Sequence, residues 1–300
     1  MKTSNVLIIG FGNIGQAHYK SFITKKNYKV FIYEKNLKLI EKLNKKNKYN
    51  FLSNLNSKKK FSIAIISANS DSRLFYLRKV LNKKIPWIIL EKFLYTKKYH
   101  YVVARNLIKN YNSSIFVNSW GNEILIRSKL KTKKSIIKKI EFIVRKGEML
   151  SNVTHFLDIS SSLAGNYEIK NFKLKKFKLK ISKRSGFNEI EGNINFKLGN
   201  TQVKIINKNS IRYHQLNIFT SNNKNIIKIF YDGSCQSFKN KKLINSFKFP
   251  YASKFSEKIF KIDSQNRNKI KYFNNYSTIS KLEENFLINI NKKVKKLRIT

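Results

Sequence analysis

The chain is poor in several residue types, and each shortage narrows what the protein can be. Its 300 residues include one cysteine, Cys235, which excludes an internal disulfide and a multi-cysteine metal site. No apolar run approaches the roughly 18 residues of a membrane-spanning helix. The short apolar run after Met1 ends in glycines, unlike a secretory signal. We therefore expect a cytoplasmic protein with no membrane span and no metal site.

Acidic residues are also scarce, since 16 Asp and Glu stand against 63 Lys and Arg, a formal net charge of +47. Such a field attracts polyanions, so a basic nucleic-acid-binding protein is one interpretation. However, the lysines are spread along the whole chain, and no zinc-finger, RNP-type or basic-zipper pattern accompanies them. We favour a solvated lysine-rich surface and expect no specific nucleic-acid partner.

Apolar residues make up 41% of the chain, which suits a globular fold, and the length suits two domains. Residues 1–120 alternate strand and helix signals. Strands are predicted at 6–9, 28–34, 61–68, 86–92 and 114–119, with helices between them, one of them over 71–81 and capped by Asp71 or Ser72. This alternation predicts βαβ units, a parallel sheet and right-handed crossovers.

The pattern changes beyond residue 120, where we place a domain boundary. A strand over 135–147 and a helix over 152–165 come first. Apolar residues then alternate with polar ones over 172–181 and 194–198, which is typical of antiparallel strands with one buried face. A helix is predicted over 280–290, with Ser280 and Glu283 at capping-box spacing. Residues 121–300 therefore predict an α/β domain with a mostly antiparallel open sheet.

The opening stretch "VLIIGFGNIGQAHYKSF", residues 6–22, predicts a dinucleotide-binding turn. Its apolar run suits a strand buried on both faces, and Gly10, Gly12 and Gly15 follow as G-x-G-x-x-G before a helical pattern. The first glycine allows a tight turn, and the second lets backbone approach a pyrophosphate. The third lets the helix pack on the strand, and the helix N-terminus offers free N–H groups to phosphate.

Glu34 ends the second predicted strand, 19 residues after Gly15. A carboxylate at this position accepts hydrogen bonds from ribose hydroxyls and repels a 2′-phosphate. NAD is therefore favoured as the cofactor, with NADP possible because Lys35 and Lys38 lie close in the sequence.

Two further segments carry candidate chemistry. Glu91 and Lys92 end the predicted strand "PWIILEK", at the edge where open parallel sheets bind ligands. "SNVTHFLD" places His155 and Asp158 on one face of a predicted helix. Histidine is the natural proton acceptor near neutral pH, although a lone histidine is more often structural.

The layout resembles the Gfo/Idh/MocA oxidoreductases over nearly the whole chain. The matching stretches are "VLIIGFGNIGQAH", "IISANSDSR", "IILEKFLYT", "VNSWGN" and "NVTHFLDISSSLAG". The resemblance implies a Rossmann domain followed by an α/β domain, and hydride transfer at a sugar or cyclitol carbon. It implies that Lys92, from the family's Glu-Lys-Pro motif, and His155 are catalytic. Within the family, the sequence is similar to members found among surface-polysaccharide genes, and this similarity implies a nucleotide-linked sugar as the substrate.

This sequence departs from the family pattern at three positions. Phe93 replaces the proline, and because a non-proline cis bond costs roughly 3–4 kcal/mol, we expect a trans loop that aims Lys92 differently. Ser151 replaces an expected catalytic aspartate. The segment "VNSWGN" keeps Asn118 but lacks the family's arginine. A cofactor-binding protein with little or no turnover is therefore the alternative.

The predicted site follows from these assignments. Catalysis is assigned to Lys92 and His155, and substrate binding to Asn118, Asn152 and Asp158. Cofactor binding is assigned to Gly10, Phe11, Gly12, Asn13, Ile14, Gly15, Glu34, Ala68, Asn69, Glu91 and Lys92. We also expect a homo-oligomer formed through the sheet of the second domain.

Overall fold

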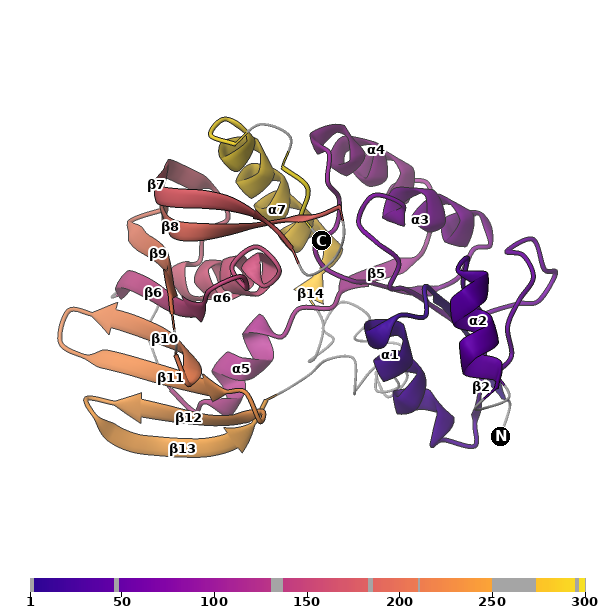
Figure 1. The fold of residues 1–300 in the computed structure, drawn as a ribbon, viewed down its shortest axis with the longest axis horizontal. Helices are drawn as coiled ribbons and strands as arrows, with labels where there is room; N and C mark the ends of the chain where they lie inside the picture. The colour runs from indigo at the N-terminus through magenta and orange to yellow at the C-terminus, as the bar shows by residue number, and fades with distance from the viewer. Residues whose placement is uncertain are drawn as a thin grey trace. The chain divides into compact units, whose positions relative to one another are not determined.

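The computed structural model describes residues 3–45, 49–130, 137–182, 186–209, 211–249, 274–294 and 297–299. The chain divides into two compact units (Figure 1). The first unit ends at Asn118 and also takes in residues 274–276, and the second begins at Ser119 and includes the residues from Ser277 onward.

The first unit is built on a sheet in the order β14-β5-β4-β3-β1-β2. Neighbouring strands from β2 to β5 pair in parallel, and the short strand β14 pairs antiparallel with β5. The strands are β1 (Ser4–Ile9), β2 (Tyr28–Tyr33), β3 (Ile63–Ile66), β4 (Trp87–Leu90), β5 (Ser114–Val117) and β14 (Asn274–Asn275). The helices are α1 (Asn13–Ile23), α2 (Leu37–Asn44), α3 (Arg73–Asn82) and α4 (Lys98–Ile108).

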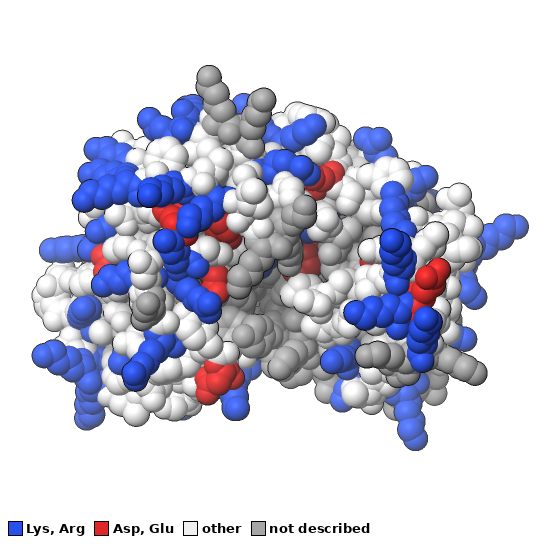
Figure 2. All heavy atoms as spheres, in the orientation of Figure 1, with Lys and Arg blue, Asp and Glu red and all other residues white. Residues whose placement is uncertain are grey.

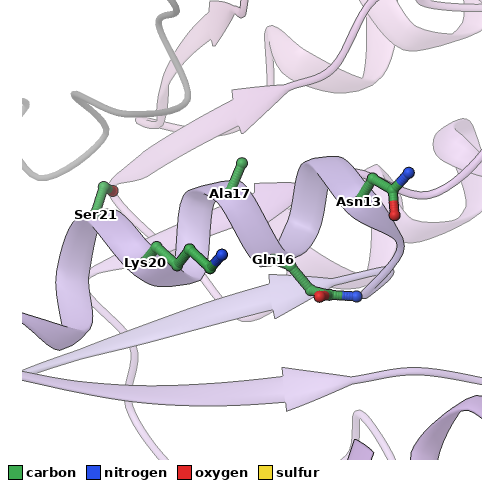
Figure 3. A pocket seen from close by; sticks show the side chains of 5 residues that line it. All are labelled: Asn13, Gln16, Ala17, Lys20 and Ser21. Carbon is green, nitrogen blue, oxygen red and sulfur yellow. The ribbon is translucent and has the colours of Figure 1, made fainter.

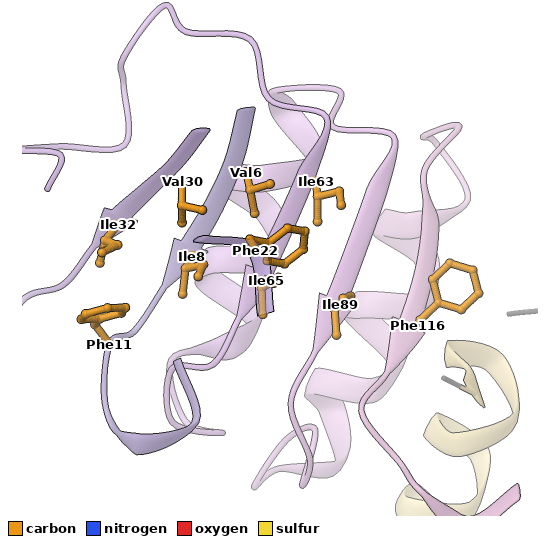
Figure 4. Close-up of a cluster of buried hydrophobic side chains, with 10 residues drawn as sticks. All are labelled: Val6, Ile8, Phe11, Phe22, Val30, Ile32, Ile63, Ile65, Ile89 and Phe116. Carbon is orange, nitrogen blue, oxygen red and sulfur yellow. The ribbon is translucent and has the colours of Figure 1, made fainter. Parts of the chain in front are cut away.

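The core of this sheet explains why its strands read as continuous apolar runs. Residues 6–9 and 63–66 are all fully buried, so both faces of β1 and β3 are covered. Alternate residues of these strands join one hydrophobic cluster, shown in Figure 4 as Val6, Ile8, Phe11, Phe22, Val30, Ile32, Ile63, Ile65, Ile89 and Phe116. Each fully buried side chain of this size stabilises the fold by about 1.5–3 kcal/mol. The predicted parallel sheet is confirmed.

The second unit is built on a sheet in the order β13-β12-β11-β10-β6-β9-β8-β7. β6 and β9 pair in parallel, and the other neighbours pair antiparallel. The strands are β6 (Ile137–Arg145), β7 (Ile169–Ile181), β8 (Asn188–Leu198), β9 (Thr201–Lys208), β10 (Tyr213–Thr220), β11 (Lys224–Phe230), β12 (Ser234–Lys239) and β13 (Lys242–Lys248). The helices are α5 (Gly121–Arg127), α6 (Val153–Ala164) and α7 (Tyr276–Asn291). The predicted mostly antiparallel sheet is confirmed.

The predicted alternation of apolar and polar residues corresponds to a buried face in one strand but not in another. In β8, Ile194, Phe196 and Leu198 are buried as predicted. In β7, by contrast, Leu179 is 43% and Ile181 82% exposed, so the expectation of a buried apolar face is wrong there. β7 is an edge strand with β8 as its one neighbour in the sheet, and two bulges shift its register. The bulges interrupt the strict period of two that the prediction assumed.

Two predicted helix caps are corrected. Helix α7 begins at Tyr276, so Ser280 is internal to the helix. Its hydroxyl donates to the carbonyl oxygen of Ser277 and does not serve as a capping-box acceptor. Ser72 does stand at the N-cap position of α3, but its hydroxyl donates to the Asn69 carbonyl, and Asp71 accepts from Thr96 instead. Both serine hydroxyls bond backbone carbonyls three residues earlier, which is a local alternative to capping, whereas the Asp71–Thr96 contact is long-range.

Within the described ranges, no helix is both long and apolar enough to cross a bilayer. Lysine and arginine side chains are scattered over the visible face of both units in Figure 2, with acidic groups among them. This distribution agrees with the interpretation of a solvated basic surface.

Candidate active site

The glycine turn between β1 and α1 has the geometry that the motif predicts. Gly10 has a φ of +87°, and a Cβ there would lie 2.7 Å from the backbone nitrogen of Ala68. A Cβ on Gly15 would lie 2.1 Å from the carbonyl oxygen of Gly10. A Cβ on Gly12 would meet nothing within 4 Å. Gly10 and Gly15 are thus required by packing, whereas Gly12 borders the open space that a pyrophosphate would need.

Glu34 ties the end of β2 to this turn. Its Oε2 accepts the Phe11 N–H at 2.6 Å, and its Oε1 accepts the N–H groups of Lys35 and Asn36 at 2.8 and 3.0 Å. A carboxylate offers about four acceptor positions, and contacts with the described residues fill three of them, which leaves one on Oε2. Glu34 therefore orders the turn and keeps capacity for a ribose hydroxyl.

The other predicted cofactor residues surround the same edge of the sheet. Asn13 opens α1 and is exposed, Ile14 is half-buried, and Asn69 is exposed in the loop after β3. The carbonyl of Ala68 accepts from the guanidinium of Arg73 at 2.7 Å. Arg73 also donates to the carbonyls of Phe93 and Leu94, so it links the loops that follow β3 and β4.

A buried polar cluster lies where β4 and β5 end. Nε2 of His18 lies 2.7 Å from Oε1 of Glu91, and the Asn118 amide donates to the same oxygen. Burial raises the pKa of the Glu91 carboxyl, but the hydrogen bond and charge of His18, the Asn118 amide and the Lys92 charge outweigh it. The net result is a pKa below the ordinary value. Glu91 is thus held as a carboxylate at the end of β4.

The segment after Glu91 corrects one prediction. The Lys92–Phe93 peptide bond is cis, so the expectation of a trans loop is wrong. The cost of an isolated cis peptide bond does not decide the conformation here, because tertiary contacts surround this one: Phe93 is 1% exposed, and its carbonyl accepts a hydrogen bond from Arg73. Lys92 itself is half-buried at the carboxyl edge of the parallel sheet.

The second unit gathers a different group around the start of α6. His155 is 3% exposed, and Oγ of Ser119 lies 3.2 Å from its Nδ1. The same hydroxyl donates to Oδ2 of Asp158 at 2.6 Å. The Trp120 ring lies over the imidazole, with centroids 4.2 Å apart and a 32° tilt. His155 is therefore held on one side by a hydroxyl and on another by an aromatic ring.

Residues before α6 fix where the helix begins. Both oxygens of buried Glu189 accept backbone N–H groups, those of Leu150 and Ser151, at 2.8 Å each. Asn152 is half-buried, and its amide donates to the Glu148 carbonyl at 3.0 Å. Asn118, Asn152 and Asp158 each contact other protein groups, and their roles toward a substrate remain predictions.

Three residues of these clusters were not singled out from the sequence. His18, Arg73 and Ser119 all lie inside motif segments, yet each has a partner far away in the chain. The His18–Glu91 contact spans 73 positions, Ser119–His155 spans 36 and Arg73–Phe93 spans 20. His18 did carry a signal in the sequence. It lies four residues before Phe22, on the apolar side of the predicted helix, which is where a buried histidine would be expected.

A pocket of about 540 Å³ runs along α1, lined by Asn13, Gln16, Ala17, Lys20 and Ser21 (Figure 3). It shares Asn13 with the predicted cofactor site, but none of these lining residues is a predicted catalytic residue. The predicted catalytic residue His155 lies in a buried cluster instead.

No protein-family model matches the chain, and no curated protein matches its sequence. Solved structures do match over nearly its full length. One is the dehydrogenase MviM of Clostridium difficile, with 14% identity, a TM-score of 0.69 and coverage of 98% of this chain and 100% of that one. Another is UDP-N-acetylglucosamine 3-dehydrogenase GnnA of Acidithiobacillus ferrooxidans, with 9% identity, a TM-score of 0.74 and 98% of both chains covered.

A third match is a Gfo/Idh/MocA family oxidoreductase of Vibrio cholerae, with 12% identity, a TM-score of 0.64 and coverage of 98% and 100%. Identities this low establish the fold, and function has to be argued from the site. The chain has the fold of the Gfo/Idh/MocA-type oxidoreductases, as the sequence resemblance implied.

Proposed function

We propose that this protein is an NAD(P)-dependent oxidoreductase that transfers a hydride between the nicotinamide and a hydroxyl-bearing carbon of a sugar. The observation that carries the proposal is the glycine turn closed by Glu34. The turn leaves open space above Gly12, and the Phe11 N–H fixes the carboxylate beside it. This combination fits a dinucleotide and has no evident packing purpose at Gly12.

The same geometry favours NAD over NADP. The acceptor position left on Glu34 suits a ribose hydroxyl, whereas a 2′-phosphate would be repelled. Loss of the carboxylate in Glu34→Ala is expected to narrow the difference between the NADH and NADPH dissociation constants. Glu41→Ala, which removes an exposed glutamate from α2, is the matched control. Tighter NADPH binding by the unaltered protein would contradict this preference.

Two side chains are assigned to the reaction. A bound nicotinamide supplies the hydride acceptor or donor. His155 takes the proton of the substrate hydroxyl as the C–H bond breaks, and returns it in the reverse direction. The ammonium of Lys92 stabilises the negative charge that develops on the substrate oxygen. Asn118, Asn152 and Asp158 are assigned to substrate binding.

We infer a nucleotide-linked sugar as the substrate class. Support comes from the relative GnnA, whose name gives UDP-N-acetylglucosamine as its substrate, and from the resemblance to members found among surface-polysaccharide genes. A chain with a formal charge of +47 also attracts the anionic diphosphate of such a substrate.

The remaining assignments are proposals of the same kind. We assign residues 1–120 to the cofactor, residues 121–300 to substrate and oligomerisation, and the protein to the cytoplasm. The homo-oligomer is expected to form through the second sheet, and light scattering of the full chain tests it.

A binding protein without turnover is the second candidate, and Ser151 favours it. The backbone N–H of Ser151 is bound by Glu189, and its side chain offers no carboxylate where the family has a catalytic one. A screen of sugar nucleotides with NAD and NADH, followed at the nicotinamide absorbance band, separates the two candidates. Turnover that is lost in His155→Ala supports the enzyme. Tight NADH binding without turnover of any substrate supports the binder.

A further inference from the structure

The hydroxyl of Ser119 bridges His155 and Asp158 inside the second unit. Its Oγ lies 2.6 Å from Oδ2 of Asp158 and 3.2 Å from Nδ1 of His155. The three residues are between 2% and 3% exposed, so the bridge is shielded from water. This arrangement fixes where the imidazole proton resides.

Counting the protons decides the direction of each hydrogen bond. A serine hydroxyl has one proton to donate, and an ionised carboxylate only accepts. The short contact to Asp158 therefore uses the hydroxyl proton. The contact to Nδ1 must then be donated by the ring, so Nδ1 carries a proton, and in a neutral imidazole Nε2 then carries none.

We propose that Ser119 and Asp158 are positioning residues that hold His155 with its proton on Nδ1, ready to accept a proton at Nε2. In the oxidative direction the substrate O–H bond breaks, its proton forms an Nε2–H bond, and its electron pair becomes the second C–O bond of the carbonyl product, while the C–H electron pair would leave as hydride to a bound nicotinamide. The imidazolium that results keeps its Nδ1–H bond to Ser119, with the Asp158 charge behind it. The reactive role of Nε2 rests on the proposed function, whereas the tautomer does not.

Two neighbours show that the space around this bridge is specified. A Cβ on Gly121 would lie 2.2 Å from Oδ2 of Asp158, so a glycine is needed for the carboxylate to reach its place. The Trp120 ring, 4.2 Å from the imidazole, restricts rotation of that ring about its own axis. Trp120 and Gly121 follow Ser119 directly in the chain, at the start of α5.

The arrangement is distinct from a hydrolase triad of the same three residue types. In such a triad the serine contacts Nε2 and the carboxylate contacts Nδ1, so that the hydroxyl is a nucleophile. Here the serine lies between the other two, contacts Nδ1, and is 2% exposed. Ser119 thus relays a hydrogen bond and has no access to an acyl group.

The tautomer is measured directly by long-range proton–nitrogen NMR on the full chain carrying ¹⁵N-histidine. The chain has four histidines, and the signals lost in His155→Asn assign this ring. The unaltered protein is expected to show a protonated Nδ1 and an unprotonated Nε2. A proton on Nε2 instead would overturn the proposal without reference to any activity.

Variants test the relay itself. In Asp158→Asn the amide can donate to Ser119, whose hydroxyl then donates to Nδ1, so the proton is expected to move to Nε2. Ser119→Thr keeps a hydroxyl and should keep the tautomer of the unaltered protein, whereas Ser119→Ala should lose it. An unchanged tautomer in both Asp158→Asn and Ser119→Ala would overturn the relay, and Ser119→Thr controls for folding.

Turnover provides the second measurement. A wrong tautomer in Asp158→Asn is expected to lower kcat by up to about ten-thousand-fold, while NADH affinity stays unchanged. If NMR shows the predicted tautomer but no sugar nucleotide turns over, the proposed function fails and the relay stands. If turnover is present and the tautomer is reversed, the relay fails and the proposed function stands.

Discussion

Nε2 of His18, on α1, lies 2.7 Å from Oε1 of Glu91, at the end of β4, and neither residue is more than 5% exposed. The contact joins the helix that follows the glycine turn to the segment that carries Lys92. It also accounts, with the Asn118 amide, for the low pKa of a buried carboxyl. A buried carboxylate of this kind makes the stability of the fold depend on pH.

Glu91→Gln should reveal this dependence. Since the pKa of Glu91 is lower in the folded chain than the ordinary value of 4.5, ionised Glu91 stabilises the fold above that pH. The contribution disappears as pH falls from about 4.5 toward the lower folded value. We expect the variant to be less stable at neutral pH by about 1.5–3 kcal/mol, with the gap closing on acidification. Urea unfolding at several pH values measures it.

Glu41→Gln, at an exposed glutamate on α2, serves as the control for the loss of one negative charge and should be as stable as the unaltered protein at neutral pH. A stability gap for Glu91→Gln that stays constant between neutral and acidic pH would contradict the assignment of the low pKa to this carboxyl.

Gly15→Ala is expected to destabilise the first unit. The new methyl group would lie 2.1 Å from a backbone oxygen, and no side-chain rotation can relieve that contact. Strain of this type costs about 1–3 kcal/mol, which lowers Tm by several degrees. Thermal unfolding followed by circular dichroism measures it, and a Tm equal to that of the unaltered chain would refute the packing role of Gly15.

Lys92→Ala and His155→Ala should each lose about a hundred- to ten-thousand-fold in kcat while the NADH dissociation constant stays near normal. The glycine turn and Glu34 supply the cofactor contacts and are unchanged in both. Lys98→Ala, at an exposed lysine on α4, controls for the loss of one positive charge. Steady-state kinetics on the first sugar nucleotide that turns over provides the measurement.

The double variant Lys92→Ala/His155→Ala tests whether the two side chains act together. If both act on one substrate, the fold-loss of kcat in the double variant should be smaller than the product of the two single losses. Full turnover in both single variants would place the chemistry elsewhere.

The parts of the fold that the sequence predicted are those with a local signal. The run from Val6 to Ile9 marks a buried strand because four consecutive apolar residues need cover on both faces. The glycine spacing is likewise local. The exposure of the apolar side chains of β7 could not be predicted from the sequence. It depends on two bulges and on the position of β7 at the edge of the sheet beside β8, and both arise only in the assembled sheet.

The residues of the candidate site also differ in whether a local sequence signal predicts them. Glu34 was predictable because its distance from Gly15 is set by one βαβ unit. The bridge from Ser119 to His155 was not, since the residues are 36 positions apart and a serine has no spacing signature. The short helix α5 was also missed, because seven residues that begin with glycine carry little helical periodicity.

Titration of the full chain with NADH, followed by nicotinamide fluorescence, tests the central claim most directly, because it needs no knowledge of the substrate. Gly12→Ala is the decisive variant: its φ of −65° accepts alanine and its Cβ would meet no protein atom within 4 Å, so the fold should be unaffected. The account predicts saturable binding by the unaltered protein, and markedly weaker binding by Gly12→Ala at an unchanged Tm. Absence of saturable binding, or equal affinity in the variant, would contradict it.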